Sequence, residues 1–188
     1  FDRPYSVMQF TLTGYLALTG LLQLFLGPIS DRVGRRPVLL WSLVLFVVAS
    51  IGASISTNFE LFMVFRCVQA AIVSGFVISR AAVRDMVSRE RAASMLGYVA
   101  MGMALAPMLA PPLGGLLAEW FGWQSNFYAL AVLGLLTATV VFFDLGETNS
   151  NRSVSFSEQF KTYPDLYRSR RFWGYCFTLV FAVGTFFA

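Results

Sequence analysis

Residues 27–37 read Gly-Pro-Ile-Ser-Asp-Arg-Val-Gly-Arg-Arg-Pro and lie between two long apolar stretches of the chain. Gly27 lets two helices approach closely, and Gly34 permits a turn that a bulky residue would resist. Asp31 comes at a helix end, where it can meet a positive helix N-terminus or an arginine, and Arg35 follows four residues later. The stretch therefore predicts a tight, charged connection between two packed helices. A short loop that simply gathers arginines is the alternative.

Apolar runs long enough to cross a bilayer recur on both sides of this connection. A hydrocarbon core about 30 Å thick needs roughly 20 apolar residues per helix. Six runs approach that length: 10–29, 38–56, 59–78, 95–117, 126–143 and 172–188. We therefore predict an all-α membrane protein, a helical bundle with about six transmembrane helices. Buried helices of a soluble protein rarely reach this length one after another.

The composition excludes most classes of enzyme. Of the 188 residues, 57% are hydrophobic and 13% are charged, about half the charged fraction of a soluble globular chain. Histidine is absent and both cysteines lie in apolar runs, which argues against zinc sites, histidine-based catalysis and a disulfide framework. No phosphate-binding loop of the form G-x-x-x-x-G-K-S/T occurs. We expect no catalytic residue, no metal site and no cofactor.

Basic residues gather in alternate loops, which predicts the orientation in the membrane. The breaks after the first, third and fifth runs carry 12 of the 14 lysines and arginines, including Arg80 and Arg84 in the break after the third run. The breaks near Thr57 and Phe121 carry none. We expect the basic loops in the cytoplasm. This topology accounts for the excess of basic over acidic residues, which therefore does not require a nucleic-acid partner.

The polar segment 144–171 is expected to be a cytoplasmic linker between two bundles. Residues 1–143 would then form most of the first bundle, and residues 172–188 would begin the second. Ser155 and Glu158 have the spacing of a capping box, which predicts a short amphipathic helix on the membrane surface. A flexible linker fits the segment equally well.

The stretch 27–37 resembles the loop signature G-x-x-x-D-R-x-G-R-R of the major facilitator superfamily, which lies between the second and third helices. Residues 66–70, Arg-Cys-Val-Gln-Ala, resemble the fourth-helix signature R-x-x-Q-G. Residues 106–115, Ala-Pro-Met-Leu-Ala-Pro-Pro-Leu-Gly-Gly, resemble the fifth-helix antiporter signature g-x-x-x-G-P-x-x-G-G. Three positions have alanine where these signatures usually have glycine: Ala70, Ala106 and Ala110.

The resemblance covers nearly the whole chain and implies helices two to seven of a twelve-helix transporter, with the first helix missing. Arg84-Asp85, Trp123 and Glu147-Thr148 look like the bicyclomycin and chloramphenicol resistance subfamily of drug/proton antiporters. A chain that begins outside the cell without an export signal agrees with a missing upstream span.

This resemblance implies a secondary transporter that exports lipophilic or amphiphilic drugs in exchange for protons, by alternating access. It also implies a monomer that crosses a bacterial inner membrane several times and contributes to antibiotic resistance. The expected partners are small-molecule substrates, protons and the lipid bilayer. A metabolite carrier of the same superfamily and a non-transporting membrane scaffold remain alternatives.

Arg66 is the one ionisable residue well inside a predicted span, and Gln69 lies on the same helical face. An unpaired guanidinium at such a position costs on the order of 3 kcal/mol, so Arg66 needs a partner. A carbonyl, cavity water or an acid on the missing helix would serve, and the resemblance implies an acid that takes up the proton. We predict that Arg66 and Gln69 belong to a proton-coupling site or substrate cavity. Simple pinning of neighbouring helices by Arg66 is the alternative.

The fifth run combines prolines with small residues. Each proline removes a backbone donor and loosens the helix, and small residues allow close contact with a second bundle. The predicted cavity-bordering residues are Met103, Ala106 and Pro107. The predicted antiporter contact comprises Ala110, Pro111, Gly114 and Gly115. A tightly packed helix without gating fits the same pattern.

Asp31, Arg35 and Asp85 are expected at the same membrane face, where they could latch the two bundles and release them during alternating access. The complete predicted switch comprises Gly27, Asp31, Gly34, Arg35, Arg36 and Asp85. Solvated surface charges are the alternative, and exposed ion pairs contribute under about 1 kcal/mol. Five residues of the first run are polar enough to line a water path or to bond between helices: Thr11, Thr13, Tyr15, Thr19 and Gln23.

Overall fold

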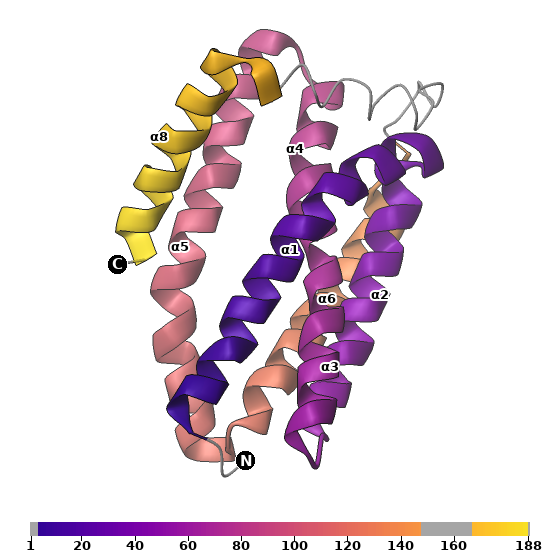
Figure 1. Ribbon diagram of the computed structural model, residues 1–188. Coiled ribbons are helices and arrows are strands. Elements are labelled where there is room, and N and C mark those ends of the chain that lie inside the picture. The colour runs from indigo at the N-terminus through magenta and orange to yellow at the C-terminus, as the bar shows by residue number, and fades with distance from the viewer. Residues whose placement is uncertain (1–3, 148–166, 188) are drawn as a thin grey trace. The chain divides into compact units, whose positions relative to one another are not determined.

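The computed structural model describes residues 4–147 and 167–187, and within them it contains helices and no β-strand (Figure 1). The helices are α1 (Tyr5–Val33), α2 (Arg35–Ser54), α3 (Phe59–Gln69), the 3₁₀ segment η1 (Ala70–Val73), α4 (Ser74–Met86), α5 (Arg89–Phe121), α6 (Gln124–Asp144) and α8 (Arg170–Phe187). The predicted all-helical fold class is confirmed.

Five stretches of the described chain are long and apolar enough to cross a membrane, and they coincide with the first five predicted runs. They are Thr11–Val33, Arg35–Ser54, Phe59–Met86, Glu90–Phe121 and Gln124–Asp144. The sixth predicted run forms α8, which has 18 residues. The helical bundle expected from hydropathy is therefore present.

One predicted loop is mostly helix. Arg80 and Arg84 were expected in the break after the third run, but both lie within α4, and only Val87 and Ser88 separate α4 from α5. The prediction of a loop at these arginines was wrong because arginine is a good helix former whose long stem can carry its charge away from an apolar surface. A helix can therefore continue past the apolar run.

The chain divides into two compact units, Phe1–Arg152 and Ser153–Ala188. Helices α1 to α6 belong to the first unit, and α8 belongs to the second. The predicted boundaries at 143 and 171 remain predictions, and the helix predicted around Ser155 and Glu158 lies outside the described residues.

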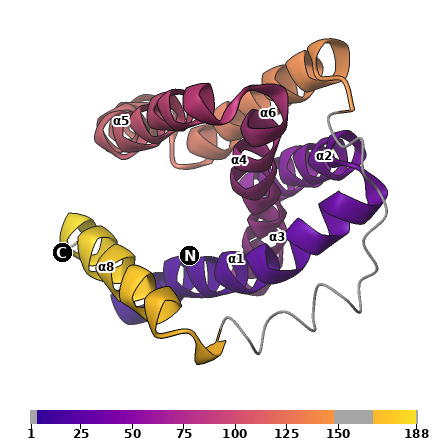
Figure 2. The same cartoon turned by 90° about the horizontal axis from the view of Figure 1, so that it is seen from above.

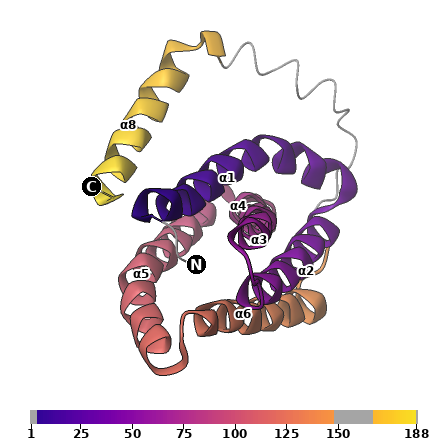
Figure 3. The same ribbon diagram turned by 60° about the horizontal axis from the view of Figure 1, so that its bottom comes forward.

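Within the first unit, α3 and α4 run end to end through the middle, with α1, α2, α6 and α5 around them (Figure 2 and Figure 3). Helix α2 packs most extensively against α6 and then against α3, whereas α5 packs only against α4 and α6 in the described structure. Gly134 of α6 permits the close contact with α2. A Cβ atom at this position would lie only 2.9 Å from the Val47 side chain, too close for a normal packing contact. Helices α1 and α5 keep most of their large apolar side chains exposed.

Gly34 alone joins α1 to α2. Its φ of 114° is one that residues with a side chain rarely adopt, and its N–H donates to the carbonyl of Ser30 at 3.0 Å. The first residue of α2 therefore follows the last turn of α1 directly.

The third span is interrupted at its middle by η1, which begins directly after Gln69. A 3₁₀ segment is wound more tightly than an α-helix. It separates α3, which carries Arg66, from α4, which carries Asp85. The hydropathy pattern does not predict this interruption, because Ala70–Val73 is as apolar as its surroundings.

Candidate functional site

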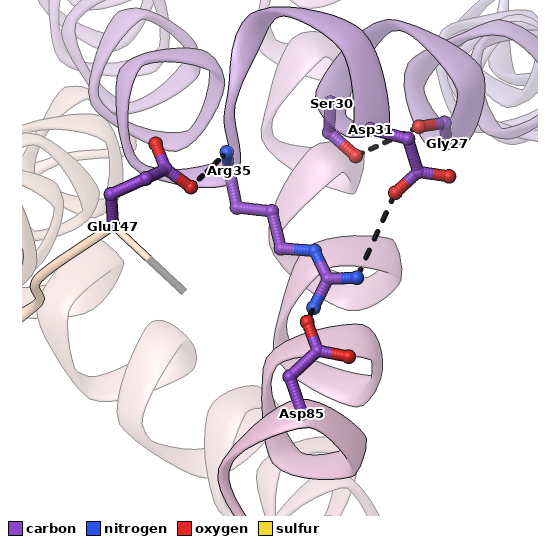
Figure 4. Close-up of polar contacts among 6 residues, drawn as sticks. All are labelled: Gly27, Ser30, Asp31, Arg35, Asp85 and Glu147. Atoms are coloured by element: carbon purple, nitrogen blue, oxygen red, sulfur yellow. Dashed lines mark hydrogen bonds and ion pairs between the residues drawn. The ribbon is translucent and has the colours of Figure 1, made fainter. Parts of the chain in front are cut away.

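A buried arginine lies between carboxylates from two other helices at the α1–α2 connection. Arg35 Nη1 pairs with Asp85 Oδ2 of α4, and Arg35 Nη2 lies 3.7 Å from Asp31 Oδ1 of α1 (Figure 4). The Arg35 side chain is 9% exposed, against 42% for Asp31 and 35% for Asp85. Three of the predicted switch residues are therefore brought together, and we call Asp31, Arg35 and Asp85 the charge cluster.

Local structure explains how the charge cluster forms. Arg35 follows Asp31 by four residues, and the Gly34 turn between them reverses the direction of the chain. Asp85 is the penultimate residue of α4. Ser30 is buried beside the turn, and its hydroxyl donates to the Gly27 carbonyl at 2.8 Å, so it needs no partner from another helix. The buried Nε of Arg35 has no hydrogen-bond partner within the described chain. The two carboxylates therefore supply the main stabilisation of this guanidinium.

The ends of α2 and α6 cap each other near the charge cluster. The backbone N–H of Arg35 donates to Glu147 Oε1 at 3.0 Å, and Arg36 Nη2 donates to the Phe142 carbonyl at 2.7 Å. A carboxylate thus lies at the positive end of α2, and a guanidinium lies at the negative end of α6. We call this arrangement the crossed cap. Arg36, predicted as part of the switch, contacts α6 instead of the charge cluster.

The second candidate site is a polar network around Arg66. Arg66 Nη1 donates to Gln69 Oε1 at 2.9 Å, and Gln69 Nε2 donates to Ser50 Oγ of α2 at 2.8 Å. Ser50 Oγ in turn donates to the Phe46 carbonyl at 2.7 Å. Gln69 and Ser50 are buried, so the network satisfies their polar atoms inside the bundle.

Two aromatic rings flank the Arg66 guanidinium. Its Cζ atom lies 4.8 Å from the Tyr15 ring centroid of α1 and 6.0 Å from the Phe127 ring centroid of α6. Both distances permit cation–π attraction. No carboxylate within the described ranges forms an ion pair with Arg66, so Gln69 and these rings hold it.

The α5 residues predicted to border the cavity lie apart from Arg66. Met103 Sδ accepts from Arg80 Nη2 of α4 at 3.8 Å, and Ala106 and Pro107 are exposed. Helices α3 and α5 do not pack together in the part of the chain that the structure describes. A shared cavity of these residues with Arg66 remains a prediction.

The predicted close-contact glycines have different surroundings. A Cβ atom on Gly27 would lie 3.6 Å from Val77 of α4, an ordinary contact that does not demand glycine. A Cβ atom on Gly114 would lie 3.2 Å from Asn126 Oδ1 of α6, so Gly114 packs inside the first unit. A Cβ atom on Gly115 would have no neighbour within 4 Å, and Ala110 and Pro111 are exposed. These last three residues are available for contact with another helix.

An apolar groove of about 520 Å³ lies between α1 and the continuous segment formed by α3 and η1. It is lined by Leu18, Leu22, Met63, Val64, Cys67, Val68 and Ala71. Cys67 follows Arg66 directly in the chain, so the groove and the Arg66 network share the same stretch of α3.

Several contacts were missed by the sequence reasoning. Ser50 carried no signal beyond being one of several small polar residues in an apolar run. Phe127 was one aromatic residue among many. Tyr15 was noted only as polar, and Glu147 only as part of a subfamily likeness. Each contact depends on which helices are neighbours, which hydropathy does not determine.

A family model described as "Major Facilitator Superfamily" matches residues 1–188. The chain is 35% identical over 185 residues to a "Chloramphenicol resistance protein" of Pseudomonas aeruginosa, covering 97% of this chain and 43% of that protein. It is 28% identical over 191 residues to a "Bicyclomycin resistance protein homolog" of Haemophilus influenzae, covering 100% of this chain and 48% of the relative. It is also 39% identical over 141 residues to a "Multidrug resistance protein MdtL" of a Shewanella species, covering 74% of this chain and 35% of that protein. The chain spans less than half the length of each of these relatives.

Proposed function

The chain belongs to the Major Facilitator Superfamily, and on this basis we propose that it is part of a secondary transporter that exports lipophilic or amphiphilic drugs in exchange for protons. The observation that carries the proposal is the 35% identity, over 97% of the chain, with a protein named for chloramphenicol resistance. The complete transporter would act as a monomer in a bacterial inner membrane. Its partners would be small-molecule substrates, protons and lipid.

The apolar groove supports a lipophilic substrate. Ligand pockets commonly have volumes of about 300–1,000 Å³ and mostly apolar walls, and the groove has about 520 Å³ lined by aliphatic and sulfur-containing side chains. Arg66 precedes Cys67 in α3 and is not itself a lining residue of the groove. The groove therefore suits the apolar part of a substrate.

The Arg66 network supports proton coupling. A guanidinium has five N–H donors, and the one contact to Gln69 leaves others available to a carboxylate or a substrate oxygen. A carboxylate that binds Arg66 when ionised, and leaves it when protonated, would link proton uptake to substrate release. This acid lies outside the described residues.

The charge cluster supports alternating access. Arg35 holds α1, α2 and α4 together through two acids that are partly exposed and therefore accessible to competing groups. Making and breaking these pairs would stabilise one orientation of the bundles over the other. Gly34 and the crossed cap would set the position of Arg35 in this switch.

Flux measurements in proteoliposomes that contain the complete transporter test this function. We expect chloramphenicol to move only under an imposed pH gradient, and we expect Arg66→Ala to lower that flux about tenfold or more, a loss of roughly 1.4 kcal/mol. Arg66→Lys should be intermediate, because lysine keeps the charge and loses the planar fork of donors. Flux without a gradient would exclude antiport, exclusive transport of a sugar or amino acid would indicate a metabolite carrier, and no flux of any solute would favour a scaffold.

A further inference from the structure

Among the residues that the structure describes, no carboxylate pairs with the Arg66 guanidinium, and its two aromatic neighbours come from different helices. We propose that Tyr15 of α1 is a positioning residue for Arg66, which orients the guanidinium toward its proton-carrying partner. This inference rests on the proposed function and adds a residue of α1 to a coupling site otherwise located on α3.

The geometry of cation–π contact makes a ring suitable for this role. The N–H bonds of a guanidinium lie in its plane, whereas an aromatic ring attracts it through its face. Tyr15, at 4.8 Å, can therefore restrain Arg66 without using any of its donors. Gln69 uses one donor on Nη1, and the remaining donors stay available to an acid.

The two rings are restrained to different degrees. Phe127 packs edge-to-face against Phe62 at 5.5 Å and against Trp123 at 6.0 Å, and Phe62 and Trp123 also pack edge-to-face. Tyr15 has no aromatic neighbour of this kind in the described part of the chain. The Phe127 ring is therefore held in place by its aromatic neighbours, whereas the position of the Tyr15 ring depends on the position of α1.

The nearer ring also makes the stronger contact. The Phe127 centroid is at 6.0 Å, close to the outer limit for cation–π attraction, and the Tyr15 centroid is at 4.8 Å. Loss of the Tyr15 ring would leave Arg66 with Gln69 and a distant ring only. The guanidinium would then occupy several orientations, and fewer of them would meet the acid.

Three variants of the complete transporter test this role. Tyr15→Leu removes the ring, Tyr15→Phe keeps the ring without the hydroxyl, and Tyr128→Leu removes an exposed ring of α6 next to Phe127 as a matched control. The measurement is chloramphenicol flux into proteoliposomes across a range of pH under a fixed pH gradient. We expect Tyr15→Leu to lower the maximal flux about tenfold, Tyr15→Phe to retain most of it, and Tyr128→Leu to match the parent.

The pH profile separates positioning from general damage. With Arg66 less well oriented, the coupling carboxylate should be protonated more readily, so the midpoint of the profile should move to higher pH in Tyr15→Leu. In an Arg66→Ala background, the residual flux under the pH gradient should be the same with and without Tyr15→Leu, because Tyr15 acts through Arg66.

Three results would overturn the inference while leaving the proposed function intact. Tyr15→Leu could transport like the parent, Tyr15→Phe could be as impaired as Tyr15→Leu, or Tyr15→Leu could lower flux equally without Arg66. By contrast, absence of gradient-driven flux in the parent would refute the proposed function and this inference with it.

Discussion

The backbone N–H of Arg35, at the start of α2, donates to the carboxylate of Glu147, which lies 112 residues later and just past the end of α6. Arg36 reaches back to the last turn of α6, where its guanidinium lies 5.6 Å from the Phe142 ring and bonds to the Phe142 carbonyl. Two helices that pack extensively along their lengths are thereby also fixed at one end. This attachment leaves the side chain of Arg35 for the charge cluster.

The crossed cap predicts the effect of removing Glu147. Glu147→Ala should lower the free energy of unfolding by about 0.5–2 kcal/mol, as the loss of other N-terminal caps does, and Glu147→Gln should cost less because its amide oxygen still accepts. Thermal unfolding of the purified complete transporter measures both. Glu119→Ala, which removes an exposed carboxylate from the last turn of α5, is the control. Equal midpoints for Glu147→Ala and Glu119→Ala would show that the cap contributes no stability.

The charge cluster predicts unequal effects of its two acids. Asp85→Asn should destabilise by about 1–3 kcal/mol, because it leaves the buried Arg35 with only the more distant carboxylate. Asp31→Asn should cost under about 1 kcal/mol, because Asp31 is more exposed and its contact is 3.7 Å long. Asp31→Asn should nevertheless impair cycling at near-normal membrane levels. Transport rates and unfolding midpoints test the two effects separately, and an unchanged rate in Asp31→Asn would reduce the cluster to surface charge.

Gly114 and Gly115 are neighbours with different expected effects. Gly114→Leu should lower stability, because even its Cβ atom would crowd Asn126 within the first unit. Gly115→Leu should fold normally and still impair transport, because its open position is suited to close contact with another helix. Membrane level and unfolding midpoint report the first effect, and drug flux reports the second. Normal flux in Gly115→Leu would remove this residue from the antiporter contact.

Membrane orientation is testable with single cysteines in a background lacking Cys67 and Cys176. Thr57→Cys should react with an impermeant thiol reagent in intact cells, whereas Ser88→Cys, in the short α4–α5 connection, should react only after lysis. The opposite pattern would invert the predicted topology.

Sequence alone predicted the helical class and the positions of the spans, because the apolar content of a bilayer-crossing helix is local information. It also identified Arg66 with Gln69, since an arginine within an apolar run is costly and residues three apart share a helical face. Asp31 and Arg35 could be paired for a similar reason, because only a short turn separates them in sequence.

The remaining contacts depend on helix neighbours, and neighbours are set by packing. The bond from Gln69 to Ser50 exists because α2 lies beside α3, and Glu147 reaches Arg35 because α6 lies beside α2. Arginines do not by themselves mark a loop, because an arginine stem can extend a helix past its apolar part, as Arg80 does in α4. Gly114 lies beside Asn126 of α6, a neighbour that the small-residue pattern of α5 does not reveal.

The η1 segment has a rotational consequence for the charge cluster. Each 3₁₀ residue turns about 120°, compared with about 100° in an α-helix, so Ala70–Val73 rotates α4 by about 80° relative to an uninterrupted α-helix. Asp85, which pairs with Arg35, lies beyond this segment in α4. These four residues lie directly after Gln69 of the Arg66 network. A change in their helical pitch would therefore rotate α4 about its axis and turn the Asp85 carboxylate away from Arg35.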